Sequence, residues 1–175
     1  MISTLLNAYG LIVFAACVFF FFITVSNILW LMHTLTIERK KNGPSVAVLI
    51  PARNEALRIR PCIDSLLSQD YKSYQIYVID DNSDDETWNI LKSYMIRFPS
   101  KFKAFKAEPL PENWYGKPHA LQELATHVKE NYLLCTDADT IHKPDSISKA
   151  MAAAEKYKAD LITGYAHHLM PTFAE

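Results

Sequence analysis

A long run without charged side chains at the start of the chain most constrains how this chain can fold. Between Leu5 and Met32 there is no Asp, Glu, Lys or Arg, and the stretch LIVFAACVFFFFITVSNILW fills residues 11–30. About 20 apolar residues suffice for a helix to span a bilayer, and a buried core helix is rarely apolar on all sides over such a length. A cleavable signal peptide is the competing interpretation, but no basic leader precedes the run and no small-x-small cleavage site follows it. We therefore expect residues 5–32 to form a transmembrane helix.

Basic residues follow this segment and none precedes it. Arg39, Lys40 and Lys41 come directly after the apolar run, whereas the short N-terminal tail carries no basic side chain. By the positive-inside rule, this asymmetry predicts that the rest of the chain faces the cytoplasm. We expect a single-pass protein of the cell membrane, with a basic juxtamembrane linker over residues 33–44 and a cytoplasmic domain over residues 45–175.

The composition limits the classes of partner. The 175 residues carry 18 Lys and Arg against 19 Asp and Glu, so the formal net charge is −1 and no nucleic-acid partner is expected. Cys17, Cys62 and Cys135 have unrelated spacings, which indicates neither a disulfide framework nor a zinc site. The reducing cytoplasm agrees with this cysteine usage.

After the sequence Asn-Gly-Pro at 42–44, short apolar runs alternate with longer segments of helical period. We expect strands over residues 46–51, 74–80, 101–107, 131–137 and 159–165, and helices ending near residue 69 and over residues 83–98, 118–129 and 144–158. Ser83 and Glu86, three residues apart, predict a capping box at the start of the second helix. The alternation predicts an α/β fold with a mainly parallel sheet and helices on both faces.

Polar residues follow three of the predicted strands, in the sequences PARNE, DDNSDD and DAD. Ligands of open parallel sheets bind beyond the carboxyl ends of the strands. Asp137 and Asp139 are two residues apart and can point to one side of an extended segment, where their like charges disfavour each other unless they share a cation. Mg²⁺ or Mn²⁺, held by one or two carboxylates and by substrate phosphates, meets this requirement. A solvated loop or helix cap is the structural alternative, and the placement after a buried strand favours the metal–diphosphate site.

Two further segments contain candidate ligand-binding residues. Asp81 can accept the imide N–H of a uracil ring or a ribose hydroxyl, although its neighbours in DDNSDD can equally form a turn and cap a helix. Lys117 lies near a predicted helix start, where its ammonium and backbone N–H groups can face phosphate, but a solvated surface lysine fits the pattern as well. Trp114 and Tyr115 can stack on a ring or serve ordinary packing. The histidines His119, His142, His167 and His168 share no metal-ligand spacing, so structural or solvent-facing roles are expected.

Taken in order, the segments VAVLIPARNE, YVIDDNSDDET, WYGKPHAL and LLCTDADT resemble the N-terminal part of family 2 glycosyltransferases of the GT-A fold. Within that family, the apolar anchor together with PENWYGKPHA resembles bacterial membrane enzymes that glycosylate carotenoid-type or hopanoid-type lipids. The resemblance implies that a sugar is transferred from a nucleotide-sugar donor, commonly a UDP-sugar, with inversion, and that residues 45–175 form a partial nucleotide-sugar-binding domain. It also implies a divalent cation as cofactor and a lipid-type or membrane-associated acceptor.

The resemblance assigns roles by position. It places Pro51, Ala52 and Glu55 beside the nucleoside, Asp81 on the uracil, Asp137 on the ribose or the sugar, and Asp139 on the metal. With Lys117, these residues make up the predicted donor and metal site. The cation would neutralise charge as the diphosphate leaves.

The resemblance stops where the chain ends. Full-length relatives continue into an acceptor-binding half that supplies a carboxylate general base, and Asp145 and Asp160 do not match its position. We therefore expect the chain to be C-terminally incomplete, with the catalytic base absent from it. The alternative to a working transferase is a nucleotide-sugar-binding fragment or subunit that needs a partner chain to complete the acceptor site.

Two other enzyme classes fit these motifs less well. A nucleotidyltransferase would be favoured by a glycine-rich loop after the first strand, but PARNEALRIR contains no glycine. A phosphatase of the haloacid dehalogenase type needs an aspartate nucleophile at the end of that strand, where Pro51 stands instead. A purely structural role leaves the three polar strand ends unexplained.

Overall fold

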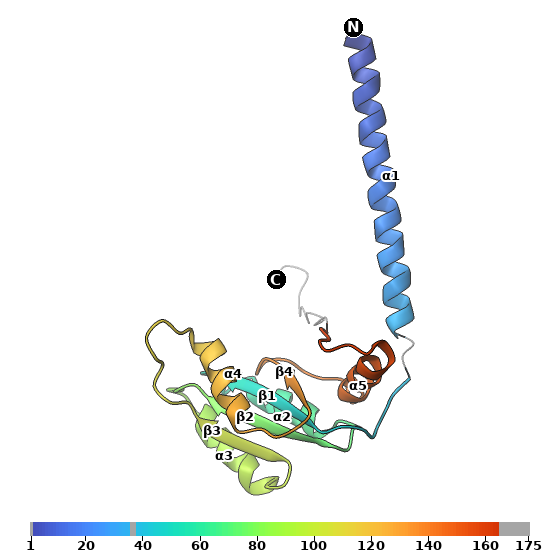
Figure 1. The fold of residues 1–175 in the computed structure, drawn as a ribbon. Helices are drawn as coiled ribbons and strands as arrows, with labels where there is room; N and C mark the ends of the chain where they lie inside the picture. Colours follow the sequence, from blue (N-terminus) through green and yellow to red (C-terminus); the bar gives the residue numbers. More distant parts are fainter. Residues whose placement is uncertain (1, 36–37, 165–175) are drawn as a thin grey trace. The chain divides into compact units, whose positions relative to one another are not determined.

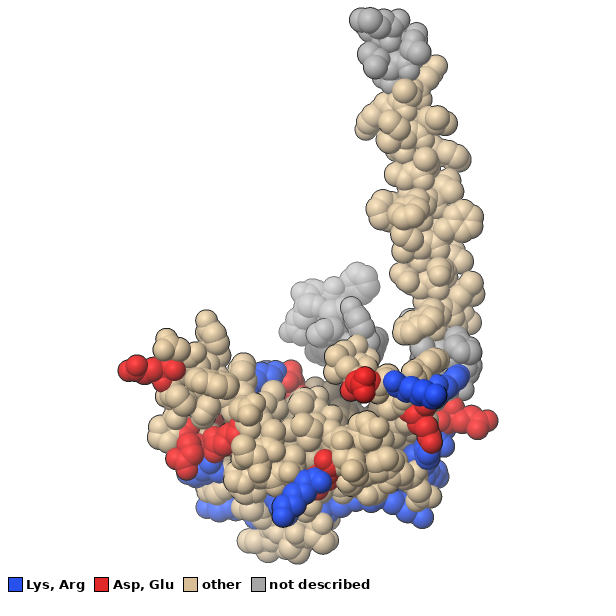
Figure 2. All heavy atoms as spheres, viewed as in Figure 1, with Lys and Arg blue, Asp and Glu red and all other residues tan. Residues whose placement is uncertain are grey.

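The computed structural model describes residues 2–35 and 38–164, and the chain divides into two compact units, residues 1–38 and 39–175. The first unit is one helix, α1 (Ile2–Leu35), whose segment Asn7–Trp30 is long and apolar enough to cross a bilayer. Figure 2 shows no acidic or basic side chain along its described length. The hydroxyl of Thr24 donates to the Phe20 carbonyl at 2.9 Å, so this polar group is satisfied within the helix. Length and composition thus make α1 a candidate membrane span, although a signal sequence near an N-terminus passes the same test.

The second unit is built on a four-stranded sheet in which all neighbouring strands run parallel (Figure 1). The strands are β1 (Val46–Ala52), β2 (Tyr74–Asp80), β3 (Phe102–Lys106) and β4 (Tyr132–Cys135), in the spatial order β3-β2-β1-β4. The central strands β1 and β2 are buried almost throughout, as expected when both faces of a parallel sheet are covered. Because all four strands are parallel, their carboxyl ends lie at one edge of the sheet.

Helices cover both faces of the sheet, as the sequence predicted. They are α2 (Ile59–Leu67), α3 (Thr87–Arg97), α4 (Gly116–Thr126) and α5 (Ser146–Tyr157). On one face, α2, α3 and α5 pack against β-strand residues such as Val48 and Ile50. On the other face, α4 packs through Leu124 against Leu49 and Ile79. Each such fully buried aliphatic side chain contributes about 1.5–3 kcal/mol to the folded state.

The predicted capping box at the start of α3 is wrong. The helix begins at Thr87, and neither Ser83 nor Glu86 caps it through a side-chain hydrogen bond. The hydroxyl of Ser83 instead accepts the backbone N–H of Asn54 at 2.9 Å, and Asp85 accepts the N–H of Thr87 at 2.9 Å. The contact with Asn54 joins two loops 29 residues apart, which a local spacing pattern does not reveal.

Two expectations about the later strands, β4 and a fifth strand at residues 159–165, are also corrected. The strand β4 was expected to be buried, but it lies at the sheet edge, and Leu133 is 52% exposed. Residues 159–164 form no strand, and Leu161 is 82% exposed. An apolar run predicts a strand only where a neighbouring strand can pair with it, and β4 pairs only with β1 in the described part of the chain. Residue 165, the last of the expected fifth strand, lies outside the described residues.

Candidate functional site

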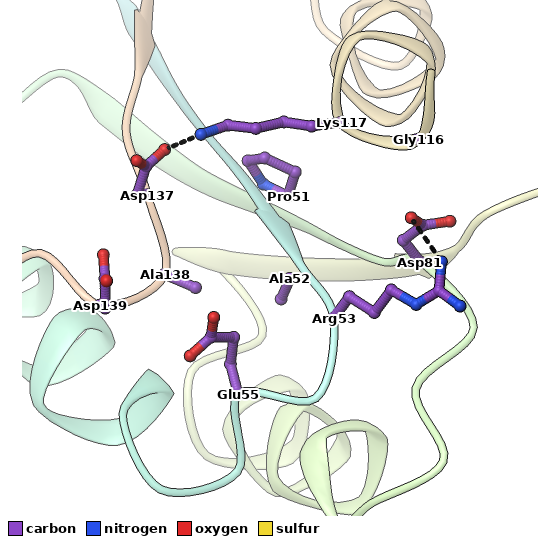
Figure 3. Close-up of a pocket in the computed structure, with 10 residues that line it drawn as sticks. All are labelled: Pro51, Ala52, Arg53, Glu55, Asp81, Gly116, Lys117, Asp137, Ala138 and Asp139. Atoms are coloured by element: carbon purple, nitrogen blue, oxygen red, sulfur yellow. Dashed lines mark hydrogen bonds and ion pairs between the residues drawn. The ribbon is translucent and has the colours of Figure 1, made fainter. Parts of the chain in front are cut away.

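A cavity of about 380 Å³ opens at the carboxyl edge of the sheet, at the ends of β1, β2 and β4 and at the start of α4. Its volume falls in the range of small-molecule sites. The residues that line it are Pro51, Ala52, Arg53, Glu55, Asp81, Gly116, Lys117, Asp137, Ala138 and Asp139. All seven residues predicted for the donor and metal site are among them. Figure 3 shows Asp137 and Asp139 on one side of the cavity, Asp81 on the other, and Pro51 and Ala52 between them.

The loop after β1 brings Glu55 to the cavity. Asn54 turns the chain with a φ of 56°, a left-handed conformation that asparagine adopts more readily than most residues. The side chain of Asn54 accepts the N–H of Asp84 at 2.8 Å, and the N–H of Glu55 donates to the Thr87 hydroxyl at 2.9 Å. Hydrogen bonds to the following βα loop therefore fix the position of Glu55.

Burial raises the pKa of Glu55, and the negative charges of Asp139, Asp85 and Asp137 add to this effect, while Arg58 opposes it. The Arg58 guanidinium is 3.9 Å from the Glu55 carboxylate. Burial is the main cause of the raised pKa, and the aspartate charges make a smaller contribution. An incoming cation would relieve the repulsion between these carboxylates.

Asp81 stands at the end of β2, where its N–H donates to the Ala52 carbonyl at 2.8 Å. Arg53, a lining residue that the sequence analysis did not single out, places its guanidinium 3.8 Å from the Asp81 carboxylate. The only sequence signal for Arg53 was its position inside PARNE, between two predicted site residues. Gly116 approaches from α4, and a Cβ at this position would lie 2.9 Å from Asp81 Oδ2. Glycine at the start of α4 thus allows the helix to contact the Asp81 carboxylate.

The segment after β4 presents two carboxylates to the cavity, although it is a turn and not the extended segment that was expected. Ala138 is 4% exposed and packs into the core, whereas Asp137 and Asp139 on either side of it are exposed. The N–H of Thr140 donates to the Asp137 carbonyl at 3.3 Å. The buried alanine therefore holds the two aspartates at the cavity wall.

Lys117 lies in the first turn of α4 and extends to the opposite wall. Its ammonium donates to Asp137 Oδ1 at 2.5 Å (Figure 3). Both side chains are more than half exposed, so this ion pair contributes little to stability. A weak pair of this kind is easily exchanged for a ligand.

The remaining candidates do not line the cavity. The Trp114 ring meets the His119 ring edge-on at 5.6 Å, and Tyr115 is 82% exposed. His142 has a structural role, since its Nε2 is 3.0 Å from the Thr136 hydroxyl, and burial lowers its pKa so that the ring is neutral at neutral pH. His167 and His168 lie outside the described residues.

The donor set fits an open cation site more closely than a closed one. Within residues 2–35 and 38–164, no three His, Cys, Asp or Glu side chains come together as ligands. Two carboxylates, Asp137 and Asp139, are available on one turn, and the cavity is lined by four carboxylates against two cationic side chains. A hard divalent cation with this few protein ligands takes the rest from water or substrate phosphates.

Residues 47–168 match the family model described as Glycosyl transferase family 2. The chain belongs to this family. The match covers more than half of the sequence, and it includes every residue of the predicted donor and metal site.

Two curated relatives illustrate the similarity. EpsE of Bacillus subtilis (strain 168), whose name assigns it only provisionally as a glycosyltransferase, is 29% identical over 125 residues, covering 70% of this chain and 43% of EpsE. The 4,4'-diaponeurosporenoate glycosyltransferase of Staphylococcus aureus (strain bovine RF122 / ET3-1) is 32% identical over 107 residues, covering 61% of this chain and 27% of that protein. The chain thus spans less than half the length of these relatives.

Two solved structures share the fold. S. aureus TarS in complex with UDP-GlcNAc aligns with a TM-score of 0.57 and 23% identity, covering 75% of this chain and 38% of that one. The mannosyltransferase PcManGT from Pyrobaculum calidifontis, in complex with GDP-Man and Mn²⁺, aligns with a TM-score of 0.56 and 24% identity, covering 70% and 37%. Together with the parallel sheet, these alignments confirm the predicted GT-A type of fold.

Proposed function

We propose that this chain carries the donor-binding half of a membrane-anchored glycosyltransferase. The reaction transfers a sugar from a nucleotide-sugar, a UDP-sugar in this proposal, to a lipid or other membrane-associated acceptor with inversion. The observation that carries the proposal is that all seven residues assigned from the sequence line one cavity at the carboxyl edge of the sheet.

The cavity offers distinct groups to each part of a UDP-sugar. In the proposed arrangement, Pro51, Ala52 and Glu55 border the nucleoside, and Asp81 accepts the imide N–H of uracil. The Arg53 guanidinium lies 3.8 Å from the same carboxylate, at the uracil end of the cavity. Asp137, on the opposite wall, contacts the ribose or the sugar.

The diphosphate would lie between Lys117 and Asp139. Lys117 contacts Asp137, and in the proposed complex its ammonium moves to the phosphate oxygens. This exchange frees Asp137 for the donor. Asp139 has no cationic partner within 4.0 Å among the described residues, which supports its assignment to the metal.

A Mg²⁺ or Mn²⁺ ion held by Asp139 would neutralise charge on the departing diphosphate. The two carboxylates on one turn, and the excess of carboxylates over cationic side chains around the cavity, support such an ion. The structure of PcManGT, which has a similar fold, contains Mn²⁺ together with GDP-Man, and this also supports a divalent cation here.

The helix α1 supports the membrane anchor in this proposal, and one relative supports the class of acceptor. The apolar helix Asn7–Trp30 would anchor the chain as a single span in the cell membrane, and Arg39, Lys40 and Lys41 would keep the domain on the cytoplasmic side. Similarity to the 4,4'-diaponeurosporenoate glycosyltransferase, over 61% of this chain, supports a lipid-type acceptor.

A second candidate is a nucleotide-sugar-binding chain that acts only with a partner chain supplying the acceptor site and the base. It is favoured by the carboxylates around the cavity. Within the described residues, those that line it are Glu55, Asp81, Asp137 and Asp139. The proposal assigns each of them to the donor or the metal, which leaves none of them as the base. Asp145 is held instead by Lys149 at 2.9 Å and by Arg39 at 3.4 Å. Turnover of a UDP-sugar by the purified chain alone would exclude this candidate.

The test of donor class is a nucleotide comparison on the full chain in detergent micelles. UDP, CDP, GDP and ADP are titrated in the presence of Mn²⁺ by calorimetry. We expect UDP to bind more tightly than CDP, because uracil N3–H donates to Asp81 whereas cytosine N3 is an acceptor at the same position. Equal affinity for CDP and UDP would contradict the assignment of Asp81, and tighter binding of GDP would replace the UDP-sugar by a GDP-sugar.

A further inference from the structure

The turn that carries Asp137 and Asp139 is held in place by polar side chains of α2 and of the residues just after it. Cys62, Ser65 and Gln69 are spaced by three and four residues, so they lie along one stripe of this segment. Cys62 is fully buried and Gln69 is 9% exposed. The other inward residues of α2 are the apolar Ile59, Ile63 and Leu66.

Each member of the stripe bonds to a different point of the segment between β4 and α5. The Cys62 thiol is 3.5 Å from the Asp137 carbonyl, and the Ser65 hydroxyl accepts the N–H of His142 at 3.0 Å. The Gln69 side chain donates to the Lys143 carbonyl at 2.7 Å and accepts the N–H of Ile147 at 3.0 Å. The backbone of this segment is therefore fixed at successive points along its length.

A side-chain hydrogen bond closes the turn itself. The Thr136 hydroxyl and His142 Nε2 are 3.0 Å apart and join the two ends of residues 136–142, which we call the aspartate loop. The Thr136 N–H donates to the Leu49 carbonyl at 3.1 Å, so the first end of the loop also stays on the sheet. With Ala138 buried in the core, the loop is pinned at its two ends and near its middle.

We propose that Thr136 and His142 are positioning residues that close the aspartate loop and thereby hold Asp137 and Asp139 toward the cavity before the ligand arrives. The inference rests on the proposed function, in which Asp139 binds the metal. Neither residue lines the cavity, so both act through the two aspartates. Holding the carboxylates in place lowers the entropy lost on binding, and outer groups that orient metal ligands typically affect metal affinity about 10–100-fold.

The test measures Mn²⁺ binding to the full chain in detergent, with saturating UDP, from the electron paramagnetic resonance signal of free Mn²⁺. Thr136→Val removes the hydroxyl and keeps the shape, whereas Thr136→Ser keeps the hydroxyl. Thr126→Val is the matched control, because it removes a threonine hydroxyl that bonds to the Glu123 carbonyl at 2.7 Å on α4, away from the loop.

We expect Thr136→Val to weaken Mn²⁺ binding by about tenfold or more, with Thr136→Ser and Thr126→Val close to wild type. All four proteins should melt at the same Tm, and this separates loop positioning from a general loss of structure. Unchanged Mn²⁺ affinity in Thr136→Val would overturn the inference, as would an equal loss in Thr126→Val or no recovery in Thr136→Ser. If folded wild-type protein binds UDP but never Mn²⁺, the metal assignment of the proposed function fails and this inference fails with it.

Discussion

Replacing Gly116 by alanine should separate donor affinity from stability. A Cβ at this position would lie 2.9 Å from Asp81 Oδ2, whereas ordinary contact begins at 3.4 Å, so the carboxylate oxygen must move by about half an ångström. A hydrogen bond from uracil to this carboxylate would be worth about 1.5–3 kcal/mol. Lengthening it by that distance should lose about 1 kcal/mol, which corresponds to about fivefold weaker UDP binding. The fold should not suffer, because the atom that must move is the end of a side chain and not backbone.

The assay pairs calorimetric titration of UDP, with Mn²⁺ present, with a thermal melt of the same preparation. Gly164→Ala is the control, since a Cβ at that position meets nothing within 4 Å. The expected result is weaker UDP binding by Gly116→Ala with an unchanged or raised Tm, and no change of either quantity in Gly164→Ala. UDP affinity within a factor of about two of wild type would refute the placement of uracil on Asp81.

Three further predictions address other contacts of the domain. Lys117→Met should weaken binding of UDP by about tenfold and leave binding of uridine unchanged, because the ammonium is proposed to act on phosphate; an equal loss for both ligands would contradict that role. Cys62 should resist alkylation at neutral pH until the chain is unfolded, because it is buried and burial raises the pKa of its thiol to about 12. Mass spectrometry of alkylated native and denatured samples checks this, and rapid labelling of the native protein would contradict the packing of α2. The Lys149 ammonium, with Arg39, lowers the pKa of Asp145, so the charged carboxylate stabilises the fold above its unfolded pKa and loses that effect as pH falls through the lowered folded value. Lys149→Met should therefore reduce the drop in Tm between about pH 6 and about pH 3. An unchanged drop would count against the ion pair.

Much of the site could be predicted from the sequence because its residues follow strand ends. Apolar runs located β1, β2 and β4, and the carboxyl ends of parallel strands must meet at one edge of a sheet. Asp81, Asp137 and Asp139 come directly after these strands, so their convergence followed from topology alone. The helix α4 was expected from residue 118 and begins at Gly116, which leaves Pro118 in its first turn, a position that tolerates proline.

The contacts that hold the site in place could not be predicted in the same way. The bonds of Asn54 to Ser83 and of Ser65 to His142 join residues 29 and 77 positions apart, and no local pattern encodes such pairs. The pairing of Lys117 with Asp137 depends on how closely α4 approaches β4 across the sheet edge. The strand expected at residues 159–164 was wrong for a related reason, since strand formation there depends on a pairing partner and not on the apolar run itself.

The central claim is that the cavity binds a nucleotide diphosphate through a metal held by Asp139. The most direct measurement is calorimetric titration of UDP into the full chain in detergent, with and without Mn²⁺, beside Asp139→Asn and the control Asp160→Asn, which alters an exposed carboxylate outside the cavity. The account predicts binding that requires Mn²⁺, is lost in Asp139→Asn and persists in Asp160→Asn. Binding that ignores Mn²⁺ or survives in Asp139→Asn would contradict the metal assignment, and no binding by folded wild-type protein would contradict the donor site itself.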